Sequence, residues 1–461
     1  MMEVESFHLQ ERHVNFYLLR AAIIAALGGL LFGFDTAVIS GTTDWLRSVF
    51  DLSPFWLGLT VASALIGTIA GAIAAGRPAD FLGRRRVLVI IAVLYFISAV
   101  GSAAAWDWLS FLFFRFIGGV AVGGASVVSP MYIAEISPAR LRGRLVAVTQ
   151  FNIVFGILLA FFSNYLIAQF ELGALEWRWM FGIEIFPAAV FFGLLFLTPL
   201  SPRWLVAQKR SDEAREVLRN LGTDTGDLEA KVNEIRNSLG SSRHSLKEPF
   251  FRSAYLRPIL LAVAIAMFNQ LSGINALMYY APYIFKMAGA GADSALLQTV
   301  AVGGTNLIFT MLALLVIDHF GRRRLMLVGS IGYIVSLSST AWAFYAHGTE
   351  FTPTGSVVVL VSLLVFIASH AFGQGAVIWV FLAEIFPNRI RARGQALGSS
   401  IHWVMAALIS WTFPIIAAQS GGHTFAFYAV MMVLQLFWVL LFMPETKGVP
   451  LEEIQKKLGI S

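Results

Sequence analysis

Three ionisable residues lie inside long apolar stretches of the N-terminal part of the chain: Asp35, Arg115 and Glu184. A lone charge in hydrocarbon costs about 3 kcal/mol on membrane-insertion scales, so such residues mark functional sites by default. An arginine that has a carboxylate partner avoids much of this cost. We therefore expect the helices that carry these residues to bring Asp35 and Glu184 around Arg115.

A carboxyl group in this setting can bind and release a proton. Burial favours the neutral form of Asp35, whereas proximity to Arg115 favours the carboxylate. A conformational change that alters the distance between them, or the access of water, would therefore move the proton on or off Asp35. A proton-coupled carrier requires this property. The alternative is a static buried ion pair that fixes helix packing.

Side-chain amides form a second group inside apolar segments: Gln150, Asn269, Gln270, Asn275 and Asn306. An amide donates and accepts hydrogen bonds at once, which suits a ligand rich in hydroxyl groups. Gln270 and Asn275 would diverge by about 140° on a regular helix. They face one cavity only if the helix breaks, and Ser272-Gly273 between them allows such a break. For any one amide, the alternative role is a hydrogen bond between helices.

The elements that carry these residues are predicted to be membrane helices. The chain of 461 residues is 57% hydrophobic and 13% charged, and its mean hydropathy is +0.74. Apolar windows of about 20 residues predict twelve spans at 18–40, 55–76, 87–106, 109–131, 145–168, 179–198, 256–284, 295–317, 325–346, 356–382, 395–418 and 424–443. We therefore expect an all-α membrane protein.

Composition excludes several other classes of protein. The chain has no cysteine, so disulfides, thiol catalysis and cysteine-ligated metals are excluded. Its net charge of +6 resides in short tracts between apolar segments, which fits membrane topology better than nucleic-acid binding. Residues 1–20 show no cleavable signal peptide. We find no metal cluster, nucleophile elbow or phosphate loop, and expect neither an enzyme nor a cofactor.

Basic residues are distributed unevenly among the loops. The loops after the second, fourth, eighth and tenth spans contain thirteen arginines, in clusters such as Arg84-Arg85-Arg86 and Arg322-Arg323-Arg324. The loops after the odd-numbered spans contain only Arg47, Arg178 and Lys286. The positive-inside rule therefore predicts that the arginine clusters and both termini are cytoplasmic.

The two halves of the chain repeat each other. Asp80 and Arg84 follow the second span as Asp318 and Arg322 follow the eighth, and Ala134-Glu135-Ile136 follows the fourth span as Ala383-Glu384-Ile385 follows the tenth. Such repeats are typical of transporters, with the substrate between the halves. We predict an N-terminal six-helix half (1–198), a cytoplasmic linker (199–253) and a C-terminal six-helix half with a tail (254–461).

The linker differs from the halves in composition, because it is rich in charged residues and serine. Ser211 and the acidic residues after it predict a capped helix start. A second helix is expected over 227–239. The alternative is a disordered charged linker.

On these residues the chain resembles the sugar porter family of the major facilitator superfamily, and the likeness covers nearly its whole length. The matching stretches are the two Asp-to-Arg loops, the two Glu-to-Arg loops, Ser201-Pro202-Arg203-Trp204-Leu205, Gln270-Leu271-Ser272-Gly273-Ile274-Asn275 and Pro444-Glu445-Thr446-Lys447-Gly448. The resemblance implies the major facilitator fold and a sugar:proton symporter for a pentose or hexose.

A facilitative sugar uniporter is the closest alternative, and a drug or organic-ion antiporter on the same fold is more distant. A sugar sensor is disfavoured because it usually needs a long soluble tail. The resemblance also implies a multi-pass protein of the cell (inner) membrane, embedded in lipid and active as a monomer.

The resemblance further implies roles for the charged loops and for the amides. The loop charges would form a cytoplasmic salt-bridge latch made of Asp80, Arg84, Glu135, Arg142, Asp318, Arg322, Glu384 and Arg391. Plain positive-inside charge would explain the arginines of this set, although it leaves the acidic residues unexplained.

The sugar contacts would be Gln150, Gln270, Asn275, Asn306 and Trp379, with Phe32 and Tyr279 as aromatic neighbours. Asn269 departs from the family pattern, and so does His402, which precedes Trp403. All three residues are included in the candidate site. We expect His402 to be a neutral hydrogen-bonding group between helices, and the alternative is a second proton site.

Overall fold

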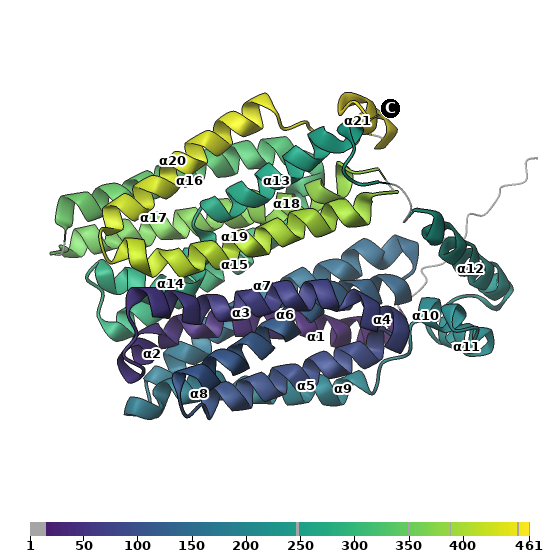
Figure 1. The fold of residues 1–461 in the computed structure, drawn as a ribbon, viewed down its shortest axis with the longest axis horizontal. Coiled ribbons are helices and arrows are strands. Elements are labelled where there is room, and N and C mark those ends of the chain that lie inside the picture. Colours follow the sequence, from purple (N-terminus) through teal and green to yellow (C-terminus); the bar gives the residue numbers. More distant parts are fainter. Residues whose placement is uncertain (1–14, 246–248, 349, 388, 450, 461) are drawn as a thin grey trace, which may run out of the picture.

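The computed structural model describes residues 15–245, 249–348, 350–387, 389–449 and 451–460. Every regular element in these ranges is a helix, and 12 helical segments are long and apolar enough to cross a membrane. The predicted all-helical protein with twelve membrane spans is therefore confirmed. The long helices form two groups, and three further helices, α10 (Pro202–Ala207), α11 (Ser211–Asn220) and α12 (Leu228–Ser245), lie at one end of the bundle (Figure 1). We refer to this end as the linker end and to the opposite end as the far end.

The first group of helices contains six spans. They are α1 (Phe16–Val38), which continues through a 3-10 turn (Ile39–Thr42) into α2 (Thr43–Val49), then α3 (Pro54–Ala74), α5 (Arg84–Ala103), α6 (Trp108–Ile136), α7 (Ala139–Ala168) and the pair α8 (Glu176–Gly182) and α9 (Ile185–Leu195). The short helix α4 (Gly76–Leu82) joins α3 to α5. The sixth span is interrupted because Pro187 cannot donate a backbone hydrogen bond to Ile183. Glu184 lies in this interruption.

The second group also contains six spans, two of which are broken. They are α13 (Leu256–Leu271) and α14 (Ile274–Met287), α15 (Ala292–Phe320), α16 (Arg322–His347), α17 (Pro353–Phe372) and α18 (Gln374–Glu384), α19 (Arg391–Ala417) and α20 (Gly421–Leu441). Between α13 and α14, Gly273 adopts φ 86°, a conformation that only glycine reaches easily. The break at Ser272-Gly273 is the one that the sequence predicts. Gly373 separates α17 from α18.

The linker between the groups is helical. It contains α10 (Pro202–Ala207), α11 (Ser211–Asn220) and α12 (Leu228–Ser245), which pack around a small core with Trp204 and Leu218. The two helices predicted here are present. The predicted cap is wrong, because Ser211 is already helical and the preceding residue, Arg210, makes no capping bond. Arg210 instead pairs with Glu213 at 2.5 Å, and this hydrogen bond lowers the pKa of Glu213.

The two groups of helices meet mainly through α3 with α19 and α7 with α15. Gly58, near the start of α3, lies so close to α19 that a Cβ there would come within 2.0 Å of the Trp411 carbonyl oxygen. Gly303 of α15 similarly faces Leu158 and Phe161 of α7. Because α3 begins and α19 ends at the far end, the Gly58 contact closes the bundle at that end.

Candidate functional site

The buried charges of the first group form an ion pair between α1 and α6. Arg115 Nη1 lies 2.6 Å from Asp35 Oδ1, and each side chain is only 1% exposed. The second guanidinium nitrogen, Nη2, donates to the Asp35 backbone carbonyl at 3.1 Å. The Arg115 guanidinium also lies over the Phe181 ring, 5.2 Å from its centroid. The guanidinium group of Arg115 thus contacts one carboxylate, one backbone carbonyl and one aromatic face.

Glu184 is the third buried charge, and it stands apart from this ion pair. Glu184 is 1% exposed, and its Oε1 atom has no hydrogen-bond partner within the described residues. Among the described residues, the carboxylate that pairs with Arg115 is Asp35, and no ion pair joins Arg115 to Glu184. Glu184 nevertheless lies near enough for electrostatic interaction with both residues. The three residues therefore gather as the sequence suggests, but only two of them form an ion pair.

The amides converge in the second group, where α13 reaches its break. Gln270 Nε2 donates to Asn269 Oδ1 at 3.2 Å and lies 3.2 and 3.3 Å from the two ring nitrogens of His402. Gln270 is fully buried, yet its Oε1 atom has no hydrogen-bond partner in the part of the chain that the structure describes. A buried acceptor without a partner is costly unless a ligand satisfies it. This oxygen can accept a hydrogen bond from a hydroxyl group.

An aromatic wall runs from α1 across to α18. Ring centroids lie 5.8 Å apart for Phe32 and Trp403, 5.0 Å for Trp403 and His402, and 5.1 Å for His402 and Trp379. Trp379 is 40% exposed although it lies midway along α18. Such a wall suits the apolar face of a ring-shaped polar ligand. It also connects the two groups of helices, because Phe32 belongs to the first and the other three residues to the second.

The remaining candidates lie outside this cluster of hydrogen bonds. Gln150 on α7 and Asn275 on α14 are partly buried, and Tyr279 is buried. Asn306 on α15 accepts a bond from Thr310 at 3.4 Å, within its own helix. Among the described residues, no hydrogen bond joins these four to Gln270 or His402. The structure thus brings together part of the predicted amide set.

Comparison with known proteins places this geometry in a family. The family model described as "Sugar (and other) transporter" matches residues 21–458. The chain belongs to the sugar transporter family. It is 40% identical to the D-xylose-proton symporter of Escherichia coli (strain K12) over an alignment 478 residues long, gaps included, that covers 95% of each chain. It is 34% identical to the arabinose-proton symporter of Bacillus subtilis (strain 168), with 96% of each chain covered.

Solved structures show the same similarity in three dimensions. The inward open conformation of the E. coli xylose transporter XylE matches with a TM-score of 0.83 and 39% identity, covering 96% of this chain and 100% of that one. The proton:xylose symporter XylE bound to 6-bromo-6-deoxy-D-glucose matches with a TM-score of 0.76, covering 96% and 99%. This transporter is therefore an all-helical, multi-pass membrane protein of the major facilitator fold.

At the linker end of the transporter, the predicted latch residues form two equivalent clusters, one in each group of helices. Arg84 pairs with Asp80 and with Glu135, both at 2.9 Å. Ser201 Oγ completes the first cluster by donating to Glu135 Oε2 at 2.5 Å. The carboxylate of Glu135 thus ties the start of α5 to the start of the linker.

The second cluster repeats this arrangement. Arg322 pairs with Asp318 at 3.1 Å and with Glu384 at 2.8 Å, and Thr446 Oγ1 donates to Glu384 at 2.6 Å. Arg142 and Arg391 differ from this prediction: they donate to the backbone carbonyls of Ala134 and Phe386, and neither pairs with a carboxylate of the described residues.

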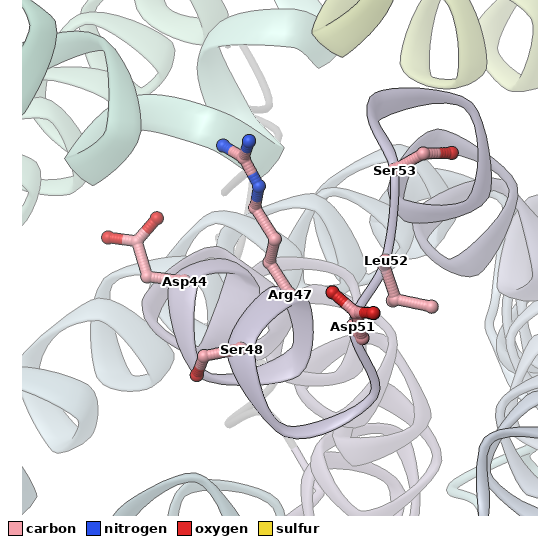
Figure 2. A pocket seen from close by; sticks show the side chains of 6 residues that line it. All are labelled: Asp44, Arg47, Ser48, Asp51, Leu52 and Ser53. Carbon is pink, nitrogen blue, oxygen red and sulfur yellow. The ribbon is translucent and has the colours of Figure 1, made fainter.

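At the far end, the transporter has an ion pair that joins the two groups. Lys286 Nζ at the end of α14 lies 2.6 Å from Asp44 Oδ2 on α2. Asp44, Arg47 and Asp51 line a cavity of about 580 Å³ here (Figure 2). None of the candidate sugar ligands lines this cavity. The sequence does not reveal the pair, because Asp44 and Lys286 fall just outside the predicted spans 18–40 and 256–284, where a charge is unremarkable.

A group of neutral polar residues inside the second group of helices was also missed. Tyr333, His370, Gln374 and Gln435 are joined by hydrogen bonds. Their signal was available, since a histidine and two glutamines interrupt apolar spans as Asp35 does. Their partners could not be inferred from spacing, because the four residues lie on four different helices.

Proposed function

We propose that this transporter couples the uptake of a sugar, a pentose or hexose, to the entry of a proton by alternating access. The observation that carries the proposal is the Asp35–Arg115 pair, fully buried at 2.6 Å in a chain of the sugar transporter family. The relatives named as D-xylose-proton and arabinose-proton symporters support it, since each covers 95% or more of this chain.

Asp35 is the proton carrier in this proposal, and Arg115 and Glu184 tune it. Proton binding neutralises the Asp35 carboxylate and removes its attraction to Arg115, so the contact between α1 and α6 weakens. Release of the proton restores the ion pair. Glu184 lies in the interruption of the sixth span with one oxygen free, so it can compete for Arg115 when Asp35 is neutral. The alternative, a static ion pair, would give Asp35 no transport role.

The sugar binds apart from Asp35 in this proposal. The free Oε1 of Gln270 accepts from a sugar hydroxyl, while Trp379 and Trp403 cover the apolar ring face. The remaining proposed ligands, which approach the site from α1, α7, α13, α14, α15 and α19, are Phe32, Gln150, Asn269, Asn275, Tyr279, Asn306 and His402. His402 contributes a neutral hydrogen-bonding group that fixes the Gln270 amide.

The halves 1–198 and 254–461 move against each other about this site, with 199–253 as the linker between them. In the described conformation the Lys286–Asp44 ion pair and the Gly58–Trp411 contact hold the far end closed. The latch residues at the linker end pair within each half. The better match to an inward open structure, TM-score 0.83 against 0.76, supports an inward-facing assignment.

The arginine clusters support a cytoplasmic linker end and cytoplasmic termini. The membrane is the cell (inner) membrane. We propose that one copy of the chain is sufficient for transport, because each part of the site belongs to the same chain.

Uptake by proteoliposomes tests this proposal. Purified transporter should accumulate at least one of D-xylose, L-arabinose and D-glucose above the external concentration when the outside is more acidic. A protonophore should abolish accumulation of the sugar, so that its internal concentration only equals the external one. A facilitative uniporter would equilibrate the sugar equally with and without the gradient. Absence of any sugar uptake would point to a different substrate class.

A further inference from the structure

The tenth span is broken at Gly373, and the residues on either side of the break share one partner. Gly373 has φ −96° and ψ −99°, which lies outside the helical region. The hydroxyl of Tyr333 on α16 lies 2.5 Å from His370 Nδ1 before the break and 3.3 Å from Gln374 Oε1 after it. One hydroxyl therefore bridges the end of α17 and the start of α18.

The bridge continues as a chain of hydrogen bonds to α20 and back to α16. Gln374 Nε2 donates to Gln435 Oε1, and Gln435 Nε2 donates to Ser330 Oγ at 2.8 Å. Ser330 Oγ in turn donates to the Met326 carbonyl at 2.7 Å. If His370 carries its proton on Nδ1, every member of the chain donates to the next. The four polar side chains that follow His370 are fully buried, so the bonds among these four are made away from water.

Close backbone packing accompanies these bonds. A Cβ on Gly329 of α16 would come within 3.1 Å of the Gly373 Cα atom, and a Cβ on Gly373 would meet Gly329 at 3.0 Å. The broken backbone therefore rests directly on α16. No larger residue fits at either position without displacing one of the two segments.

The short helix α18 is fastened to α16 at both ends. Gln374 at its start bonds to Tyr333, and Glu384 at its end pairs with Arg322 at 2.8 Å. Trp379 lies midway between these attachments, with its ring 5.1 Å from His402. The contacts that fix the two ends of α18 therefore also fix the orientation of Trp379 toward the proposed sugar site.

The first group of helices provides a contrast within the same molecule. Tyr95 occupies the same position as Tyr333, eleven residues after the arginine that begins its helix. Its hydroxyl is buried without a hydrogen-bond partner among the described residues, and α6, which corresponds in the repeat to α17 and α18, runs unbroken from Trp108 to Ile136. The bridged break is therefore a property of the second group alone.

We propose that Tyr333 is a positioning residue for sugar binding, which acts by clamping the break between α17 and α18 so that Trp379 is held against the substrate. The clamp comprises Tyr333, His370, Gln374, Gln435 and Ser330. Its effect on affinity rests on the proposed function, whereas its effect on α18 does not. Without the clamp, α18 becomes less ordered, and sugar binding must supply the cost of ordering it.

Spin-label distances test the clamp without any ligand. The chain has no cysteine, so Ala383→Cys on α18 and Phe427→Cys on α20 can be labelled selectively. Tyr333→Phe in this double-cysteine protein should broaden or shift the distance distribution measured by pulsed electron paramagnetic resonance. Tyr132→Phe is the matched control, because that buried tyrosine loses one hydrogen bond, to the Pro199 carbonyl, away from the break.

Calorimetric titration with D-xylose tests the consequence for binding. Tyr333→Phe should raise Kd about five- to tenfold, the effect of one lost hydrogen bond, whereas Tyr132→Phe leaves Kd unchanged and lowers thermal stability comparably. Gln435→Leu should also raise the Kd and alter the distance distribution, and it replaces Tyr333→Phe in both experiments if that variant does not fold. Distances like those of the unsubstituted transporter in both variants would overturn the clamp. If the unsubstituted transporter binds none of the sugars, the proposed function fails, and the distances still decide the clamp.

Discussion

The two halves of this transporter bury polar groups of different kinds. The first half buries an ion pair, Asp35 with Arg115, and a further acid, Glu184. The second half buries amide and hydroxyl groups, among them Gln270, Tyr333 and Gln374, and His402 lies half-buried beside Gln270. Both halves share the same repeat, including the arginine–glutamate clusters at the linker end. The difference therefore lies in the interior and not in the architecture.

The comparison suggests a division of work between the halves. A charge buried in an apolar interior responds strongly to proton binding, because its partner is then left unpaired. Neutral amides respond little to protons, but they can exchange one hydrogen-bond partner for a sugar hydroxyl. We infer that the first half senses the proton and the second half binds most of the sugar. The aromatic wall from Phe32 to Trp379 is the contact through which the two can influence each other.

Arg115→Leu should give the largest effect on stability. It leaves Asp35 buried without its partner, and breaking a buried pair in this way costs about 3–5 kcal/mol. Gln435→Leu, in the neutral network of the other half, should cost only about 1–3 kcal/mol. Thermal unfolding of both variants in detergent measures the difference.

The double variant Asp35→Asn with Arg115→Leu is the control for this prediction. It should recover part of the lost stability, because residue 35 no longer carries a charge that lacks its partner. Equal losses for Arg115→Leu and Gln435→Leu would contradict the contrast between a charged and a neutral interior.

Gln270→Leu should weaken sugar binding more than any substitution in the first half. The loss of a buried amide that bonds the ligand corresponds to about 1–3 kcal/mol, or about 5- to 150-fold in Kd for D-xylose. Gln298→Leu is the matched control, since the side chain of that glutamine donates to Ser294, close to the start of α15 at the far end of the bundle. Calorimetric titration decides the matter, and a Kd that stays unchanged in Gln270→Leu would remove this amide from the site.

His402→Gln should have a small effect. Glutamine can still hydrogen-bond Gln270. We therefore expect the Kd for sugar to change by no more than about threefold, which is less than the loss of one typical hydrogen bond would cause. The dependence of uptake on external pH should keep its shape, because the proton is carried by Asp35. A flattened or displaced pH profile would make His402 a second proton site and would weaken the proposed division between the halves.

Lys286→Gln should have the smallest effect. The Lys286–Asp44 pair is partly exposed, with side chains 35% and 44% exposed, and such pairs contribute about 0–1 kcal/mol. Its loss should shift the equilibrium toward the outward-facing form by at most about fivefold. Asp44→Asn should produce the same shift, and the double variant no more than either one. Spin labels across the far end report the populations, and additive shifts would show that the two residues act separately.

The sequence predicts the fold well because the membrane constrains it strongly. Apolar windows locate all twelve spans, and Ser272-Gly273 correctly indicates a break in the seventh. The break at Gly373 was not anticipated, since a single glycine in an apolar run does not distinguish a break from close packing. The sequence predicts Ser211 as the cap of α11, but the helix begins at Ser211 and the cap position is Arg210, because helix ends depend on local backbone geometry.

The candidate site is predicted in part. A buried arginine needs a carboxylate, and Asp35 supplies it as expected. That Glu184 stands apart depends on how the interrupted sixth span is rotated, which spacing cannot give. The same holds for the convergence of Gln270 with His402, which lie 132 positions apart, and for the clamp residues on four helices. Residue types identify which groups need partners, and packing decides which partners they find.

The most direct test of the proposed mechanism compares uphill transport with binding in Asp35→Asn. Proteoliposomes with an acidic exterior are given, in labelled form, whichever of D-xylose, L-arabinose and D-glucose the unsubstituted transporter binds, and the internal concentration is followed to a plateau. We expect the unsubstituted transporter and Asp227→Asn, an exposed linker substitution, to accumulate sugar. Asp35→Asn should bind the same sugar with a Kd similar to that of the unsubstituted transporter. The internal sugar concentration that it produces should rise only to the external concentration. Accumulation by Asp35→Asn equal to that of the unsubstituted transporter would contradict the role of Asp35 as the proton carrier.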